Sequence, residues 1–99
     1  MKITVSRIAS SPKLELAVIV QEDRGKTHHA VTLDSGTFTR LIGTTGATPE
    51  DLVRAVFEFL LERESKESIL SRFDVTVVQR YFPEFEAEIQ NYLAKGARP

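Results

Sequence analysis

The stretch TPEDLVRAVFEFLLERE (residues 48–64) contains the strongest helix-start signal in the chain. Thr48 is a preferred N-cap residue, and Pro49 suits the first helical position because it has no N–H to satisfy. The acidic pair that follows places negative charge at the positive end of the helix dipole. At about 100° per residue, the apolar side chains cover an arc of roughly 240°, wider than a surface helix needs. We therefore expect a central helix that packs on a sheet with one side and on later helices with another.

The residues before this helix alternate between apolar and polar side chains, as β-strands do. Residues 14–21 alternate most clearly, and residues 2–8 and 27–33 follow the same pattern. Residues 22–25 supply turn-forming side chains and end in a glycine, which tolerates positive φ. The second and third strands are therefore predicted to form a hairpin, within a three-stranded antiparallel meander.

The register of this hairpin has two alternatives. A four-residue loop sets Leu16 opposite Val31, and the same register sets Leu14 opposite Leu33. A glycine bulge would slip the pairing by one residue. We favour the four-residue loop because it matches apolar residues with apolar residues.

Further helices are indicated on both sides of the central one. Residues 35–42 have apolar side chains at helical spacing, although two threonines among them favour a strand. Residues 65–68 read as a break and a new cap before the next apolar residues. Residues 74–82 again allow helix or strand, because their valines prefer strands while their apolar spacing is helical, and we favour helix. Pro83 is predicted to open the last helix, which Gly96 ends.

These elements predict an α+β fold, in which an N-terminal three-stranded antiparallel sheet is followed by three to four helices packed on one face, in the order β-β-β-α-α-α-α. Residues 1–96 form a single domain on this interpretation, and residues 97–99 form a disordered tail. An open sheet edge, at the first or the third strand, would allow two copies to pair into a homodimer.

The composition is that of a globular domain and excludes chemistry that depends on cysteine. Hydrophobic residues make up 41% of the 99 residues and charged residues 27%, as in a globular domain that folds unaided. The absence of cysteine excludes disulfides, thiolate zinc sites and thiol catalysis. The N-terminal residues lack the features of a signal peptide, and no apolar run approaches the ~20 residues of a membrane span. We therefore expect a cytoplasmic protein that does not enter a membrane.

The charge distribution does not favour a nucleic-acid partner. The formal net charge is −1, and residues 1–48 carry six Lys and Arg against four Asp and Glu. Residues 49–99 carry seven against ten. A nucleic-acid binder usually concentrates basic residues on one face, because phosphate neutralisation supplies much of its affinity.

A short glycine loop nevertheless suggests an alternative function. Gly43, Thr44, Thr45 and Gly46 match the G-x-x-G loop with which KH domains clamp a nucleic-acid backbone. The loop carries no Lys or Arg, and Pro49 follows where that family has an aliphatic residue. The plain interpretation is a helix-ending loop, and binding of a nucleic acid or small ligand through it is the alternative.

An aromatic cluster surrounds the last proline of the folded part. Tyr81, Pro83 and Glu84 are candidate partner-binding residues if this cluster forms an exposed surface. The other interpretation is that Phe82 and Phe85 belong to the core, with Tyr81 at its edge.

No catalytic residue, metal site or cofactor is predicted. His28 and His29 are neighbours on a predicted strand, so their rings point to opposite faces and do not readily bind one metal ion. Glu84, Glu86 and Glu88 could bind a cation, but only the first and third share a helix face, so we interpret them as a solvated surface. No serine or threonine has a base implied by spacing.

Four segments resemble a group of short bacterial proteins of uncharacterised function, in which a small N-terminal sheet precedes a helical region. The segments are FEFLLERE (57–64), KESIL (66–70), FD (73–74) and YFPEF (81–85). The resemblance spans roughly residues 31–89 and implies a bacterial source and a helix over residues 74–82. It implies no activity.

These observations favour a non-enzymatic protein-binding or regulatory module of a bacterial cytoplasm, with an unidentified protein as its partner. The alternative is a nucleic-acid or small-ligand binder that uses the Gly43–Gly46 loop.

Overall fold

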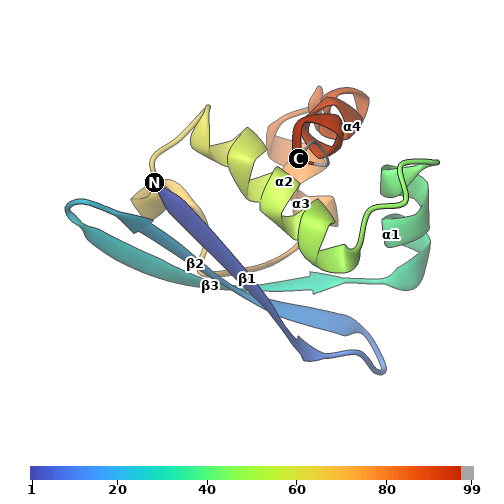
Figure 1. Ribbon diagram of the computed structural model, residues 1–99, viewed down its shortest axis with the longest axis horizontal. Coiled ribbons are helices and arrows are strands. Elements are labelled where there is room, and N and C mark those ends of the chain that lie inside the picture. The colour runs from blue at the N-terminus through green and yellow to red at the C-terminus, as the bar shows by residue number, and fades with distance from the viewer. Residues whose placement is uncertain (97–99) are drawn as a thin grey trace.

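The computed structural model describes residues 1–96 and confirms an α+β fold, with an N-terminal antiparallel sheet followed by helices. In Figure 1 the helices lie together on one side of the sheet. The elements are β1 (Lys2–Ala9), β2 (Leu14–Glu22), β3 (Gly25–Leu33), α1 (Ser35–Ile42), α2 (Pro49–Leu61), the 3₁₀ turn η1 (Lys66–Ser68), β4 (Arg72–Asp74), α3 (Thr76–Tyr81) and α4 (Phe85–Gly96).

The first three strands form the predicted meander. β2 pairs with β3 so that Leu16 lies opposite Val31, and Leu14 lies opposite Leu33. The apolar-matched register is therefore confirmed. The side chains that alternate with these residues along β2 and β3 are half-buried or exposed.

The fourth strand is not predicted by the sequence. β4 pairs with β3 in parallel, with Phe73 opposite Val31, in a sheet of order β1-β2-β3-β4. Parallel neighbours need a long crossover connection, which α1 and α2 supply. Three residues are too few for a recognisable alternation, so only their tertiary pairing defines them as a strand. The re-capped segment expected after residue 68 is instead an extended chain that leads into β4.

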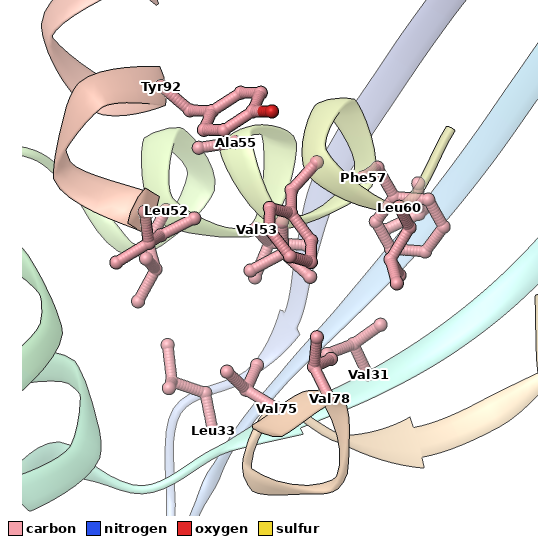
Figure 2. Close-up of a cluster of buried hydrophobic side chains, with 14 of the residues drawn as sticks. Val31, Leu33, Leu52, Val53, Ala55, Phe57, Leu60, Val75, Val78 and Tyr92 are labelled. Carbon is pink, nitrogen blue, oxygen red and sulfur yellow. The ribbon is translucent and has the colours of Figure 1, made fainter. Parts of the chain in front are cut away.

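The core lies between the sheet and the central helix. Figure 2 shows Leu52, Val53 and Leu60 of α2 extending towards the sheet and α3, while Ala55 faces Tyr92 of α4. Seven of the apolar residues of α2 are buried, which confirms the wide apolar arc. They are Leu52, Val53, Ala55, Val56, Phe57, Phe59 and Leu60.

The capping chemistry of the two predicted helix starts is present. Thr48 and Asp51 form a capping box at the start of α2, with each side chain accepting from the other backbone N–H at 3.0 Å. Asp34 caps α1 by accepting from the amide of Thr37 at 2.9 Å. The prediction that Pro83 opens the last helix is wrong, because α4 begins at Phe85 and the proline lies in the preceding turn.

The sheet order leaves β1 as its long edge, whereas β3 lies inside the sheet. Arg54 of α2 donates to the carbonyl of Ile3, and Arg7 pairs with Glu50 at 2.8 Å. The first contact engages one backbone carbonyl of this edge, whereas the second joins two side chains. Pairing of two copies through β1 stays a prediction.

Candidate functional site

A groove of about 220 Å³ lies beside the C-terminal end of α2, between the chain that joins η1 to β4 and α3. Part of its lining consists of buried apolar side chains of the core, namely Leu60, Ile69, Phe73 and Val78. We call it the α2–α3 groove. A cavity of about 150 Å³ is enough to hold benzene, so this groove has room for one bulky apolar side chain.

The groove is also lined by exposed apolar residues. Leu70 is 50% exposed and Tyr81 is 68% exposed, and both belong to its lining. Among residues 1–96, the other large hydrophobic residues that are exposed are Met1 and Ile8. Single exposed apolar residues are ordinary, but apolar residues gathered around a hollow are typical of an interaction surface.

The backbone that presents Leu70 is fixed to β3. The carbonyl oxygen of Leu70 lies 2.8 Å from Nδ1 of His29, and the amide of Ala30 donates to the carbonyl of Ser71 at 2.8 Å. Nε2 of His29 lies 2.9 Å from the hydroxyl of Thr27. Because these contacts hold the segment, the exposure of Leu70 is a property of the fold.

Lys66 holds the start of the same segment. Its side chain is only 5% exposed, and Nζ lies 3.1 Å from a carboxylate oxygen of Glu22 and also pairs with Glu67. These hydrogen bonds raise the pKa of Lys66, so the ammonium stays charged. The pair with Glu22 joins η1 to the end of β2.

Glu64 is the one carboxylate among the residues that line the α2–α3 groove. Its side chain is half-buried, and no side chain within residues 1–96 forms a hydrogen bond or an ion pair with it. Burial alone raises the pKa of Glu64. The residue also follows the C-terminal end of α2, where the helix dipole disfavours negative charge. The fold therefore keeps a carboxylate in a place that stabilises it poorly.

The structure separates the three predicted partner-binding residues. Tyr81 lines the α2–α3 groove, whereas Glu84 pairs with Arg63 at 3.1 Å, and Arg63 is absent from the groove lining. Pro83 is exposed, and its carbonyl accepts from Nε2 of Gln79 at 2.6 Å. Of the three, only Tyr81 lies at the groove.

The Gly43–Gly46 loop begins close to α4. A side chain at Gly43 would place its Cβ 2.6 Å from Nε2 of Gln90, which itself donates to the carbonyl of Leu41. The hydroxyl of Thr45 donates to the carbonyl of Ile42 at 2.7 Å. Gly43 and Gly46 have φ of 55° and 74°, a backbone conformation that glycine adopts more readily than other residues. The two glycines therefore have a structural reason to be in the loop.

A second hollow touches this loop. Its volume is about 140 Å³, and Thr45, Gly46, Arg54 and Glu58 are among its lining residues. The lining is mixed in charge, and its arginine already donates to the carbonyl of Ile3. Thr44 is not part of this lining.

The two histidines lie on opposite faces of β3, and the acidic residues at the start of the α4 region form ion pairs within the chain. His29 is buried and His28 is exposed, as expected for neighbours on one strand. Glu88 joins Glu84 at Arg63, whereas Glu86 pairs with Arg40. Within residues 1–96, no three acidic or histidine side chains gather in a way that could hold a metal ion.

Sequence reasoning missed Glu64 and Leu70. A signal for Glu64 exists, because position 64 is four residues after Leu60 and so continues the apolar face of the central helix. No such signal exists for Leu70, since its position depends on the pairing of β4 with β3.

Comparison of the chain with protein-family models, with curated proteins and with solved structures found no match. Among the described helices, none combines the length and the apolar character needed to cross a bilayer.

Proposed function

We propose that this protein is a non-enzymatic protein-binding module of a bacterial cytoplasm, and that the α2–α3 groove is its docking site. The observation that carries the proposal is that two exposed apolar residues, Leu70 and Tyr81, both line a groove whose lining is largely apolar. Partner-binding surfaces use such an apolar centre, with aromatic residues enriched in it.

The rigidity of the groove supports this function. The segment that carries Leu70 is fixed by His29 and Lys66, and Tyr81 ends a helix that packs on the core through Val78. A preformed groove loses little conformational entropy when a partner binds. Its lining contains no histidine, lysine or arginine, and Glu64 is its one carboxylate, so the lining offers no histidine–carboxylate pair and no pair of carboxylates for acid–base catalysis.

A second candidate function is small-ligand binding at the Gly43–Gly46 loop. The hollow of about 140 Å³ that includes Thr45 and Gly46 favours it. The absence of Lys and Arg from the loop makes a nucleic acid the weaker ligand class. A fragment screen followed by amide chemical shifts separates the two candidates, since ligands of the loop shift residues 43–48 and ligands of the groove shift residues 68–82.

Selection of peptides displayed on phage tests the docking function. The immobilised wild-type protein is the target, and each selected peptide is then titrated against the wild type and against the Leu70→Ser variant. We expect peptides that bind the wild type and lose at least about tenfold in affinity on Leu70→Ser, the loss expected when one of the few energetically dominant residues of an interface is truncated.

The matched control is Ile8→Ser, which removes an apolar side chain that is 60% exposed and outside the groove lining. Its binding should equal that of the wild type. Selected peptides that bind all three proteins equally, or no enrichment over a blank support, would contradict docking at the groove.

A further inference from the structure

We infer that the partner of the α2–α3 groove is basic: a protein segment that inserts a bulky apolar side chain and carries a lysine or arginine beside it, which pairs with Glu64. This inference rests on the proposed docking function and adds the chemistry of the partner. The one carboxylate of the lining lies at the same groove as Leu70 and Tyr81, so both contacts come from one short segment.

The protein does not neutralise the charge of Glu64 itself. The two cations nearest to it in sequence are engaged elsewhere. Arg63 binds Glu84 and Glu88 at 3.1 and 3.2 Å, and Lys66 binds Glu22 and Glu67. A half-buried carboxylate without a counter-charge gains most from a cation that arrives with a ligand, because water screens it less than an exposed one.

The surroundings of Glu64 favour positive charge. Glu64 follows the C-terminal end of α2, which is the negative end of the helix dipole and attracts cations. The exposed ring of Tyr81 lies at the same groove, and aromatic faces attract ammonium and guanidinium groups. An acidic partner would meet repulsion at Glu64 and no compensating cation in the lining.

The size of the α2–α3 groove limits what a partner can insert. A groove of about 220 Å³ accepts one leucine or phenylalanine side chain but not a whole amphipathic helix face. One short segment can therefore supply both the apolar anchor and the cation that pairs with Glu64. A dipeptide is the smallest probe that contains both features.

The test uses three blocked dipeptides, acetyl-Phe-Lys-amide, acetyl-Phe-Gln-amide and acetyl-Phe-Glu-amide, titrated into the full chain at pH 7 while amide chemical shifts are recorded. We expect shifts at residues 68–73 and 77–82, with the lysine peptide binding about fivefold more tightly than the glutamine peptide and the glutamate peptide binding most weakly. In Glu64→Gln, the lysine and glutamine peptides should bind equally.

The matched control is Glu58→Gln, which makes the same charge change within α2 but outside the groove lining. It should keep the preference for lysine. Equal binding of all three peptides to the wild type, or a preference that survives Glu64→Gln, would overturn the inference and leave docking at the groove intact. Absence of shifts at the groove with every peptide would overturn both.

Discussion

Two neighbouring charged residues after the C-terminal end of α2, Arg63 and Glu64, differ in whether the chain supplies a partner for them. Arg63 packs over the ring of Phe59, with its guanidinium carbon 3.7 Å from the ring centroid, and binds Glu84 and Glu88 of the α4 region. Glu64, the next residue, lines the α2–α3 groove and has no partner within residues 1–96. A charge that is paired inside the chain stabilises the fold, whereas a charge left unpaired beside an apolar groove is available to a ligand.

Asp74 extends the comparison to a second carboxylate. Burial alone would raise the pKa of Asp74, but hydrogen bonds from Thr32, Lys13 and Thr76 outweigh burial and lower the pKa to about 2. Thr32 donates at 2.6 Å, and Nζ of Lys13 lies 2.9 Å away. Two partly buried carboxylates of one small domain therefore differ in the sign of their pKa shift, because one receives donors and the other does not.

The largest expected effect is that of Asp74→Asn. The lowering of the pKa from 3.8 to about 2 corresponds to about 2 kcal/mol of stabilisation by the charged form, and we expect the variant to lose about that much free energy of unfolding at pH 7. Urea unfolding monitored by circular dichroism measures it. The control, Asp23→Asn, changes an exposed turn residue and should shift stability by less than about 0.5 kcal/mol.

The pH dependence of this effect has a definite sign. A carboxylate whose folded pKa is lowered contributes fully above its unfolded pKa and loses that contribution as the pH falls through the folded pKa. The stability gap between wild type and Asp74→Asn should therefore be constant above about pH 4 and shrink between about pH 4 and pH 2. A gap that widened on acidification would contradict the role of the ionised Asp74.

Arg63→Met should have the next largest effect. Methionine keeps the apolar contact with Phe59 but removes the bonds to Glu84, Glu88 and the carbonyl of Phe59. We expect a loss of about 1–2 kcal/mol in the free energy of unfolding. Arg80→Met, at an exposed position of α3, is the control and should change stability little. Equal losses in the two variants would show that the Arg63 side of α2 is not specially stabilised.

Local chemistry explains why much of the fold could be predicted from the sequence. The helix start at Thr48 and Pro49 and the alternation of residues 14–33 depend on neighbouring residues alone, and both are present in the structure. β4 could not be predicted in the same way. Its three residues become a strand only because Val31 lies beside Phe73, a pairing that follows from the crossover through α1 and α2.

The candidate site was less predictable for the same reason. Tyr81 could be singled out because it belongs to an aromatic segment, and it does lie at the groove. Glu84 belongs to the same segment, yet it faces Arg63, a contact across 21 residues of sequence. The place of Leu70 at the groove could not be predicted, because it depends on the pairing of β4 with β3 and on the contact of His29 with the Leu70 carbonyl.

Glu64→Gln should have a smaller effect, opposite in sign to that of Asp74→Asn. Burial raises the folded pKa of Glu64, so ionisation costs stability as the pH rises from its ordinary value of 4.5 through the folded pKa, and the full cost is present at pH 7. We expect the variant to equal the wild type below about pH 4 and to exceed it by up to about 0.5 kcal/mol at pH 7. A destabilised Gln variant at pH 7 would indicate that the carboxylate has a partner in the folded chain.

The smallest effect on stability is expected where the effect on binding is largest. Leu70 and Tyr81 are 50% and 68% exposed, so serine at either position should change the free energy of unfolding by less than about 0.5 kcal/mol. If each variant keeps the wild-type midpoint in urea and loses peptide binding, the two side chains are retained for a partner rather than for the core. A loss of 1 kcal/mol or more in Leu70→Ser, with Ile8→Ser unchanged, would instead make the Leu70 side of the groove part of the folding core. Glu64, which has no partner, would then be the remaining difference between the groove side of α2 and the side of Arg63.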